Sequence, residues 1–335
     1  MKWISIFFLL LSVKSFANTH EADLSKPSLQ KIVDRDLVPD KVENHPIRRS
    51  GIVISAVIVK DGVEERVEDL RFTADRKLNC NSGDEFKVTT DLSLDKFKLI
   101  GDWNREFQLE FEGHCSHAHK LVFNYDSTGG EYFKIRNIAY TLSEKLKEID
   151  RDSFINGKIK IKFPAGGDYY NGTVNVTKGY QWDVVGHEIG HAIYSHARIG
   201  RSGGGSHRID ECYSKELALS EGWASFFSAW VSVDLNDPMA KFEYMVPRRA
   251  PLEIEHVPSD VCTGPTNEWR VYSFLWDLID LNNDNEHLSI SFKELWDLSF
   301  KKNFSSIVEL KDEILKEGYD PVVVNVIWNQ NIEGI

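Results

Sequence analysis

The chain has 335 residues, a length that suits two domains with a sizeable core in each. Its formal charge is −12, and because the first 17 residues hold Lys2, Lys14 and no acid, the remainder carries −12 − 2 = −14. So acidic a chain is a poor partner for nucleic acid or for an anionic membrane surface. Neutral or basic peptides are easier substrates on the same ground.

The first 17 residues have the pattern of a secretory signal peptide. Met1 and Lys2 precede an apolar run from Trp3 to Val13, and Ser15-Phe16-Ala17 forms a small-x-small cleavage site. The apolar run is too short to remain as a membrane-spanning helix. We therefore expect export, to the periplasm or outside the cell, without stable membrane insertion once the signal is removed. Residues 18–50 are polar and are expected to form a lead-in or a pro-segment.

Short alternating runs separated by turn signals characterise residues 51–126. This pattern predicts a small antiparallel β-sandwich, whose role could be substrate docking, chaperoning or spacing. The expected strands are Ile52–Val59, Val67–Phe72, Phe86–Thr90, Phe97–Ile100, Phe107–Phe111 and Leu121–Tyr125.

Residues 127–335 are expected to form a second, mainly helical domain, which makes the whole chain an α+β multidomain protein. It begins with a predicted helix at Tyr132–Ile149, followed by strands at Lys158–Phe163 and Thr173–Thr177. An edge strand at the last position could bind a substrate backbone by β-addition, although a plain surface strand fits the pattern equally.

The segment His187-Glu188-Ile189-Gly190-His191 predicts a zinc site. On a helix, residues four apart share a face, so both histidines can present an imidazole nitrogen to one ion at roughly 2.0–2.1 Å. Glu188 then lies beside the metal and can act as general base, taking a proton from water whose pKa zinc lowers to about 7. This combination is typical of peptide hydrolysis.

The sequence around this motif predicts a helix over Val184–Ile199, with Asp183 as N-cap and glycines from Gly200 onward as the stop. Gly186 and Gly190 are poor helix formers, and their spacing of four leaves one face without side chains. Another element, or the substrate of the metal, could approach the helix closely there.

Glu221 is the expected third ligand. It lies in a second, strongly apolar helix predicted at Ser214–Val233, where an acid is costly unless it is paired or bound to a metal. Antiparallel packing of the two helices would bring Glu221 to the histidines and leave a free position for water. His196, five residues past His191, rotates off the ligand face.

These residues resemble the gluzincin metallopeptidases, the thermolysin-like clan, and most closely its fungalysin-type members with their Gly-Glu-Gly-Trp segment. The likeness spans about 159–300 and is specific at the two zinc helices. It implies a thermolysin-like catalytic domain over 127–335, zinc ligands at His187, His191 and Glu221, and a general base at Glu188.

The chain departs from that family at two positions. Four residues after the glutamate ligand, Ser225 stands where the family has an aspartate that hydrogen-bonds a zinc histidine, which predicts weaker metal affinity. The family's oxyanion-stabilising histidine has no clear counterpart. Tyr272 is the preferred donor, and His256, His207 and Tyr213 are the alternatives.

Four cysteines in an exported chain suggest two disulfides, with three possible connectivities. Pairing within domains, Cys80 with Cys115 and Cys212 with Cys262, is the economical choice. Zinc ligation by Cys212 is disfavoured because no second cysteine has ligand spacing.

The acidic run Asp280–Glu286 has oxygen ligands at alternate positions and resembles a calcium loop. It has Asn285 where the loop glycine belongs and Ser291 in place of the bidentate glutamate, so an acidic turn is preferred.

The predicted function is that of an exported zinc-dependent peptidase, acting as an endopeptidase on peptide or protein substrates. A catalytically silent binding protein is the first alternative, although such a protein has no need for Glu188. An aminopeptidase is the second, and it would need acidic groups near the site to hold a free α-amino group. Substrate identity and oligomeric state are not predicted.

Overall fold

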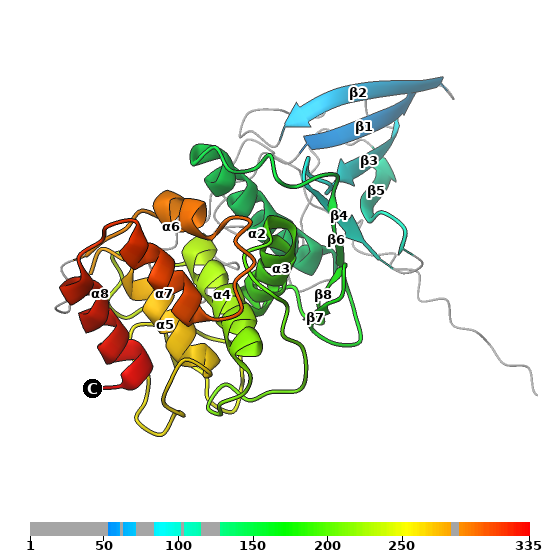
Figure 1. The fold of residues 1–335 in the computed structure, drawn as a ribbon. Coiled ribbons are helices and arrows are strands. Elements are labelled where there is room, and N and C mark those ends of the chain that lie inside the picture. Colours follow the sequence, from blue (N-terminus) through cyan, green and yellow to red (C-terminus); the bar gives the residue numbers. More distant parts are fainter. Residues whose placement is uncertain (1–52, 61–62, 72–83, 102–103, 115–127, 283–287) are drawn as a thin grey trace, which may run out of the picture. The chain divides into compact units, whose positions relative to one another are not determined.

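A computed structural model describes residues 53–60, 63–71, 84–101, 104–114, 128–282 and 288–335, and all statements on the fold refer to these ranges (Figure 1). They form an α+β structure divided into two compact units. The described part of the first unit lies within 51–91 and 108–114, and the second comprises 92–107 and the chain from 128 onward. Each unit is described by itself.

The first unit is a four-stranded antiparallel sheet with the order β2-β1-β3-β5. Its strands are β1 (Val53–Lys60), β2 (Val63–Arg71), β3 (Glu85–Asp91) and β5 (Gln108–His114), all close to their predicted positions. A sandwich needs a second facing sheet, and the described residues of this unit form one sheet, so the sandwich stays a prediction. The expected strand Leu121–Tyr125, Cys80 and Cys115 lie outside the described residues.

Strand β4 (Phe97–Ile100) belongs to the second unit, although the sequence assigned it to the N-terminal domain. It pairs in parallel with β6 (Ile159–Lys162), from Phe97 opposite Ile159 to Ile100 opposite Lys162. The connection between them contains helix α2 (Thr128–Glu148), as parallel crossovers usually do. The domain boundary thus differs from the predicted one because a short apolar strand looks the same whichever sheet it joins.

The sheet of the second unit has the order β4-β6-β8-β7. Strand β7 (Tyr169–Tyr170) turns back through Gly172, whose φ is 90°, and pairs antiparallel with β8 (Val174–Asn175). The strand expected at Thr173–Thr177 therefore does not form the edge of the sheet, the position from which it could bind a substrate backbone. Strand β8 pairs with β6 on one side and with β7 on the other, and β7 forms the edge of the sheet.

Helix α4 (Lys215–Ser232) is buried from Leu217 to Ser232 and packs against α2, α3 (Trp182–Ala197), α5 (Glu268–Asp277) and α7 (Ile307–Lys316). A helix buried on all sides must be apolar all round, which explains its run of aromatic and small residues. Figure 1 shows α4 in the middle of the helical layer. The remaining elements are β9 (Lys241–Phe242), β10 (Leu252–Glu253), α6 (Phe292–Ser299), α8 (Pro321–Trp328) and a π-helical turn at Asn329–Glu333.

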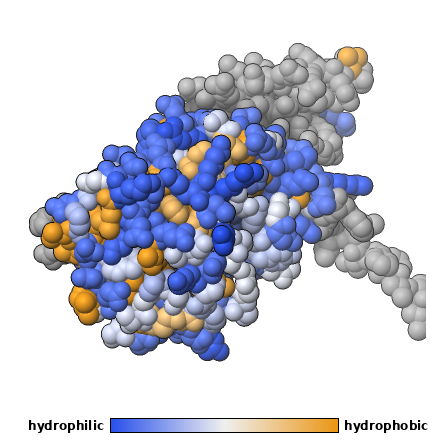
Figure 2. Space-filling view, viewed as in Figure 1, coloured by the Kyte–Doolittle hydropathy of each residue, from blue (hydrophilic) through white to orange (hydrophobic). Residues whose placement is uncertain are grey.

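The surface is mostly hydrophilic on the face shown in Figure 2, with apolar residues scattered in small groups. Exposed large apolar side chains include Met239, Leu281 and Val322. In the part of the chain that the structure describes, no helix combines the length and apolar character needed to cross a bilayer.

Candidate metal centre

Helices α3 and α4 run antiparallel and meet at two glycines. A Cβ at Gly186 would lie 2.3 Å from Oγ of Ser228, and one at Gly190 would lie 2.8 Å from the carbonyl oxygen of Ala224. As the residue numbers rise along α3, those of the contact partners on α4 fall, which shows that the two helices are antiparallel. The expectation that the glycine face of α3 permits a close approach is confirmed, and this approach brings Glu221 to the histidines.

The beginning of α3 differs from the prediction. The N-cap is Gln181, which caps with no side-chain hydrogen bond, and Asp183 lies inside the first turn, fully buried. The carboxylate of Asp183 accepts hydrogen bonds from the backbone N–H groups of Val184 and of residues 243–245, at 2.7–3.1 Å. Burial raises the pKa of Asp183, and these four donors act against that rise. Asp183 therefore anchors a distant loop to α3, a role that a capping pattern does not reveal.

Three side-chain atoms face one another where the helices meet. Nε2 of His187 and Nε2 of His191 lie 3.0 Å apart, and each lies 3.1 Å from Oε2 of Glu221. All three side chains are largely buried, with 9–14 % of their surface exposed. The structure thus brings together the three residues that the sequence proposed as ligands, and their group could hold a metal ion.

The size of this triangle suits a small dication. Ligands about 2.0–2.2 Å from a tetrahedral ion lie roughly 3.3–3.6 Å from one another, only slightly farther than the distances found here. Two imidazole nitrogens and a carboxylate oxygen form a donor set that zinc accepts in catalytic sites. A cation would also be a common partner for three atoms that otherwise face one another.

The electrostatics of the three residues are coupled. Burial opposes ionisation of Glu221, yet hydrogen bonds with His187 and His191 lower its pKa far below the ordinary value. Burial lowers the pKa of His187. In His191 burial acts in the same direction, but the hydrogen bond and charge of Glu221 outweigh it and raise the pKa. The carboxylate is therefore ionised at neutral pH and presents a negative charge to the cluster.

Glu188 lies next to the triangle without joining it. Its side chain is buried, and its Oε2 has no hydrogen-bond partner among the described residues. Burial raises the pKa of Glu188 to about 8, against the effect of His191 and together with the charges of Glu221 and Asp168. A dication nearby would favour the ionised form, since it inverts the local effect of burial.

Ser225 contacts the ring nitrogen of His187 that lies outside the triangle. Its Oγ lies 3.1 Å from Nδ1 of His187, one helical turn after Glu221. A donor–acceptor contact at Nδ1 fixes the ring so that Nε2 points into the triangle, as in metal-binding histidines generally. The sequence placed Ser225 in this position, and the structure has it there.

No protein-family model matches this chain. No curated protein matches its sequence closely enough to indicate a relationship.

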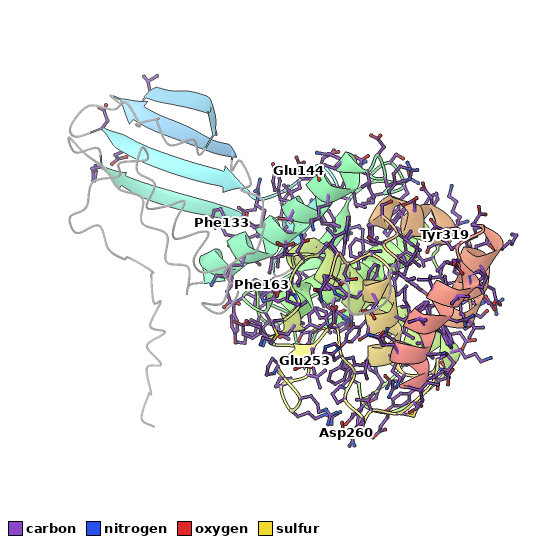
Figure 3. The ribbon with its side chains drawn as sticks, turned by 90° about the vertical axis from the view of Figure 1, so that its left-hand side faces the viewer. Phe133, Glu144, Phe163, Glu253, Asp260 and Tyr319 are labelled. Atoms are coloured by element: carbon purple, nitrogen blue, oxygen red, sulfur yellow. A yellow bond between two sulfur atoms is a disulfide. The ribbon has the colours of Figure 1, made fainter. Side chains whose placement is uncertain are left out.

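Tyr272, the preferred oxyanion donor, lies in the core. It is fully buried, its hydroxyl donates to the carbonyl of Glu253, and its ring packs between Phe242 and Trp269 (Glu253 is labelled in Figure 3). The alternative Tyr213 donates to Glu211, and His256 is exposed. None of these contacts involves the triangle.

His207 is the one of the four candidates that the structure brings to the triangle. Its Nε2 lies 3.7 Å from Oε2 of Glu221 and 3.2 Å from Oε2 of Glu268. Glu268, at the start of α5, is a residue that the sequence analysis missed. Burial raises its pKa well above the ordinary value, and Glu221 adds to the effect. The available signal was an acid in the first turn of a helix rich in aromatic residues.

The loop carrying His207 is fastened to the segment before α5. Cys212 and Cys262 form a disulfide, with Cα atoms 5.7 Å apart, so the predicted pairing is confirmed for these two cysteines. Beside it, Asn267 donates to the carbonyls of Ile209 and Glu211, and the N–H of Tyr213 donates to Thr266. Cys212 is therefore not a zinc ligand, as expected.

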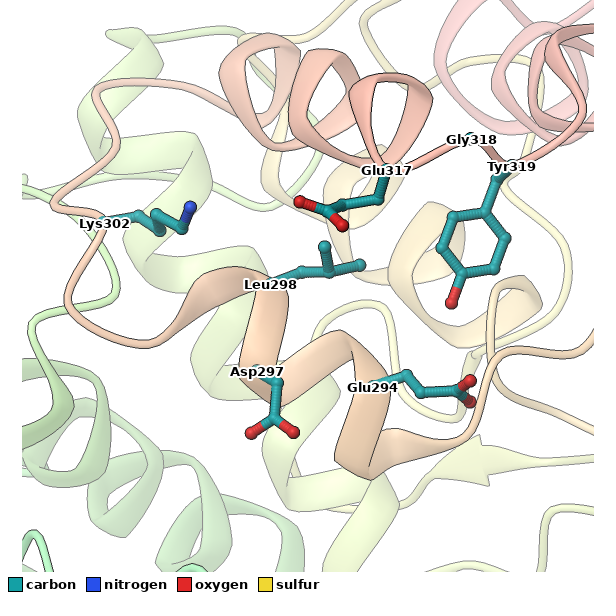
Figure 4. A pocket seen from close by; sticks show the side chains of 7 residues that line it. All are labelled: Glu294, Asp297, Leu298, Lys302, Glu317, Gly318 and Tyr319. Atoms are coloured by element: carbon teal, nitrogen blue, oxygen red, sulfur yellow. The ribbon is translucent and has the colours of Figure 1, made fainter.

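A surface hollow of about 410 Å³ lies apart from the triangle, between α6 and the turn after α7 (Figure 4). It is lined by Glu294, Asp297, Leu298, Lys302, Glu317, Gly318 and Tyr319. The acidic run that resembles a calcium loop extends into residues 283–287, outside the described ranges. Ser291, in the position of its missing ligand, is the N-cap of α6 in a capping box with Glu294.

Proposed function

We propose that the chain is an exported zinc-dependent endopeptidase of the gluzincin type. His187, His191 and Glu221 would hold the zinc ion, and Glu188 would serve as general base. The observation that carries the proposal is the position of Glu188 beside three mutually facing ligand atoms: its carboxylate is buried, and one of its oxygens has no hydrogen-bond partner in the part of the chain that the structure describes. Burying a carboxylate oxygen without a hydrogen-bond partner destabilises the fold. This cost is understandable if the carboxylate accepts and donates protons during catalysis.

Each residue of the site has a separate role in the proposed hydrolysis. His187, His191 and Glu221 would hold a zinc ion, which would lower the pKa of a bound water molecule and polarise the substrate carbonyl. Glu188 takes the proton from the attacking water and delivers it to the nitrogen of the departing amine, so it ends the cycle as a carboxylate. Ser225 keeps the imidazole of His187 in its ligand orientation. Glu188 and the three residues of the triangle are largely buried, which limits the access of bulk water to them.

The edge strand β7 supports the choice of an endopeptidase. Asp168, the residue before β7, is close enough to Glu188 to affect its pKa, and β7 packs against α3. An extended peptide could add to this edge and run past Glu188 in both directions. The Cys212–Cys262 disulfide is compatible with an oxidising, extracytoplasmic compartment.

An aminopeptidase remains the alternative enzyme, because Glu268 is an acid close to Glu221. Its Oε2 is buried, so a substrate amine would have to displace protein atoms to reach it. Peptides with free and with acetylated amino termini separate the two activities. An endopeptidase cleaves both, and an aminopeptidase cleaves the free form only. The silent binding protein would cleave neither.

The test combines metal analysis with digestion of casein and a peptide library by the mature chain. Glu188→Ala should keep zinc and lose hydrolysis by about 10²-fold or more, because a positioned general base contributes about 10²–10⁴. Glu144→Ala, on the surface of α2, is the control and should retain full activity. Full activity in Glu188→Ala would end the proposed mechanism. Unchanged zinc content in Glu221→Ala would show that the third ligand is misassigned.

A further inference from the structure

A second group of facing ligand atoms adjoins the first. One ligand atom from each of His207, Glu221 and Glu268 lies within 4.8 Å of the other two, and Nε2 of His207 is 3.7 Å from Oε2 of Glu221 and 3.2 Å from Oε2 of Glu268. The same Oε2 atom of Glu221 faces the histidines of the first group. The three residues come from the loop after α3, from α4 and from the start of α5.

The orientation of His207 is that of a metal ligand. Its Nδ1 lies 3.1 Å from the carbonyl oxygen of Gly205, which can only accept, so Nδ1 carries the hydrogen. In the neutral ring Nε2 then presents a lone pair, and this lone pair faces two carboxylates. Metal-binding histidines typically donate their other ring N–H to a carbonyl or carboxylate in this way.

Glu268 supplies a separate observation. Its side chain is 8 % exposed, and Oε2 has no hydrogen-bond partner among the described residues although Nε2 of His207 lies 3.2 Å away. The two atoms therefore approach without the geometry of a hydrogen bond. A buried carboxylate oxygen left in this state is costly, and a cation between the three atoms would remove the cost.

We propose that His207, Glu221 and Glu268 form a second site for a divalent transition-metal ion, with Glu221 bridging it to the first. One imidazole nitrogen and two carboxylate oxygens suit zinc or a neighbouring metal of the same series. The inference rests on the proposed function in that Glu221 belongs to both sites. An ion in this second site would place positive charge beside the first site, in the role for which the sequence suggests Tyr272.

The test is a calorimetric titration of chelator-stripped full-length mature protein with zinc chloride, checked by elemental analysis. The wild-type protein should bind two equivalents. Glu268→Gln, which keeps the shape of the side chain, and His207→Ala should each bind one. Glu211→Gln, an exposed carboxylate in the same loop, is the matched control and should bind two. Thermal unfolding of the stripped proteins verifies that each variant is folded.

Two results would overturn the second site: one equivalent in the wild-type protein, or two equivalents in folded Glu268→Gln. Failure of the proposed function gives a different result, namely two equivalents of zinc without cleavage of any peptide. Because zinc is counted independently of hydrolysis, the two hypotheses are tested separately.

Discussion

Ser225 approaches His187 from the side opposite the metal triangle, with its Oγ 3.1 Å from Nδ1. The hydroxyl orients the ring but brings no charge, whereas a carboxylate in the same place would make the imidazole a stronger ligand. The buried position of Ser225 on α4 means that the contact is held by packing and not by a mobile surface side chain.

We therefore expect Ser225→Asp to tighten zinc binding by about 10–100-fold and Ser225→Ala to loosen it. Chelator-competition titrations measure both affinities directly. Ser232→Ala, at the far end of α4, is the control and should bind as the wild type does. Equal affinities in all four proteins would mean that the Ser225 contact has no influence on the metal.

Gly190→Ala should destabilise the protein by about 1–3 kcal/mol, the usual cost of overpacking. The new methyl group would lie 2.8 Å from the carbonyl oxygen of Ala224 and 2.9 Å from its Cα. These are backbone atoms, so a change of side-chain rotamer cannot relieve the clash. The helices must then separate, so zinc affinity should fall as well. Denaturant unfolding and a zinc titration measure the two effects.

The control for that variant is Gly204→Ala, where a Cβ would meet no atom within 4 Å. It should leave zinc binding unchanged. A Gly190→Ala protein as stable as the wild type would contradict the close packing of α3 on α4.

Removal of the disulfide by the double variant Cys212→Ser/Cys262→Ser should lower the free energy of unfolding by about 2–4 kcal/mol. Its sequence separation is 50 residues, so the unfolded chain gains considerable freedom when the bond is absent. His187, His191 and Glu221 lie on the helices, and we expect the variant to retain the first zinc equivalent in a titration. Loss of that equivalent in a folded variant would show that the loop supports the triangle.

Asp183→Asn should lower the free energy of unfolding by about 1–3 kcal/mol. One carboxylate oxygen becomes an NH₂ group, and the backbone N–H groups that donated to this oxygen lose their acceptor in the buried site. Thermal or denaturant unfolding measures the loss. Asp297→Asn is the control, since it breaks an ion pair with Arg151 in which the aspartate is 40 % exposed, and such pairs contribute about 0–1 kcal/mol. Equal stability of the two variants would argue against the anchoring role of Asp183.

The three residues of the triangle were predictable because their geometry is local. The spacing of His187 and His191 fixes them on one helical face, and an acid within an apolar helix pointed to Glu221. The position of Ser225, one turn later, followed from the same periodicity. These predictions depend on helix geometry and on the cost of burying an acid, and the close approach of the helices was visible in the spacing of Gly186 and Gly190.

The features that escaped prediction depend on the path of the chain between elements. His207 reaches Glu268 through a loop held by hydrogen bonds and a disulfide, and no periodicity encodes that path. In the same way, β4 carries no local sign of its parallel partner β6, and the turn at Gly172 decides which strand forms the sheet edge. Asp183 was misassigned because an acid near a helix start fits both a cap and an anchor.

The antiparallel pair α3–α4 also bears on the order in which the molecule assembles. His187 and Glu221 are 34 residues apart, so the first ligand triangle closes within one helical hairpin of low contact order. Glu268 is 47 residues beyond Glu221 (268 − 221) and joins only when α5 docks. We expect the hairpin to gain metal affinity before the rest of the helical layer is complete, so zinc present during folding would favour the native pairing of these two helices over competing ones.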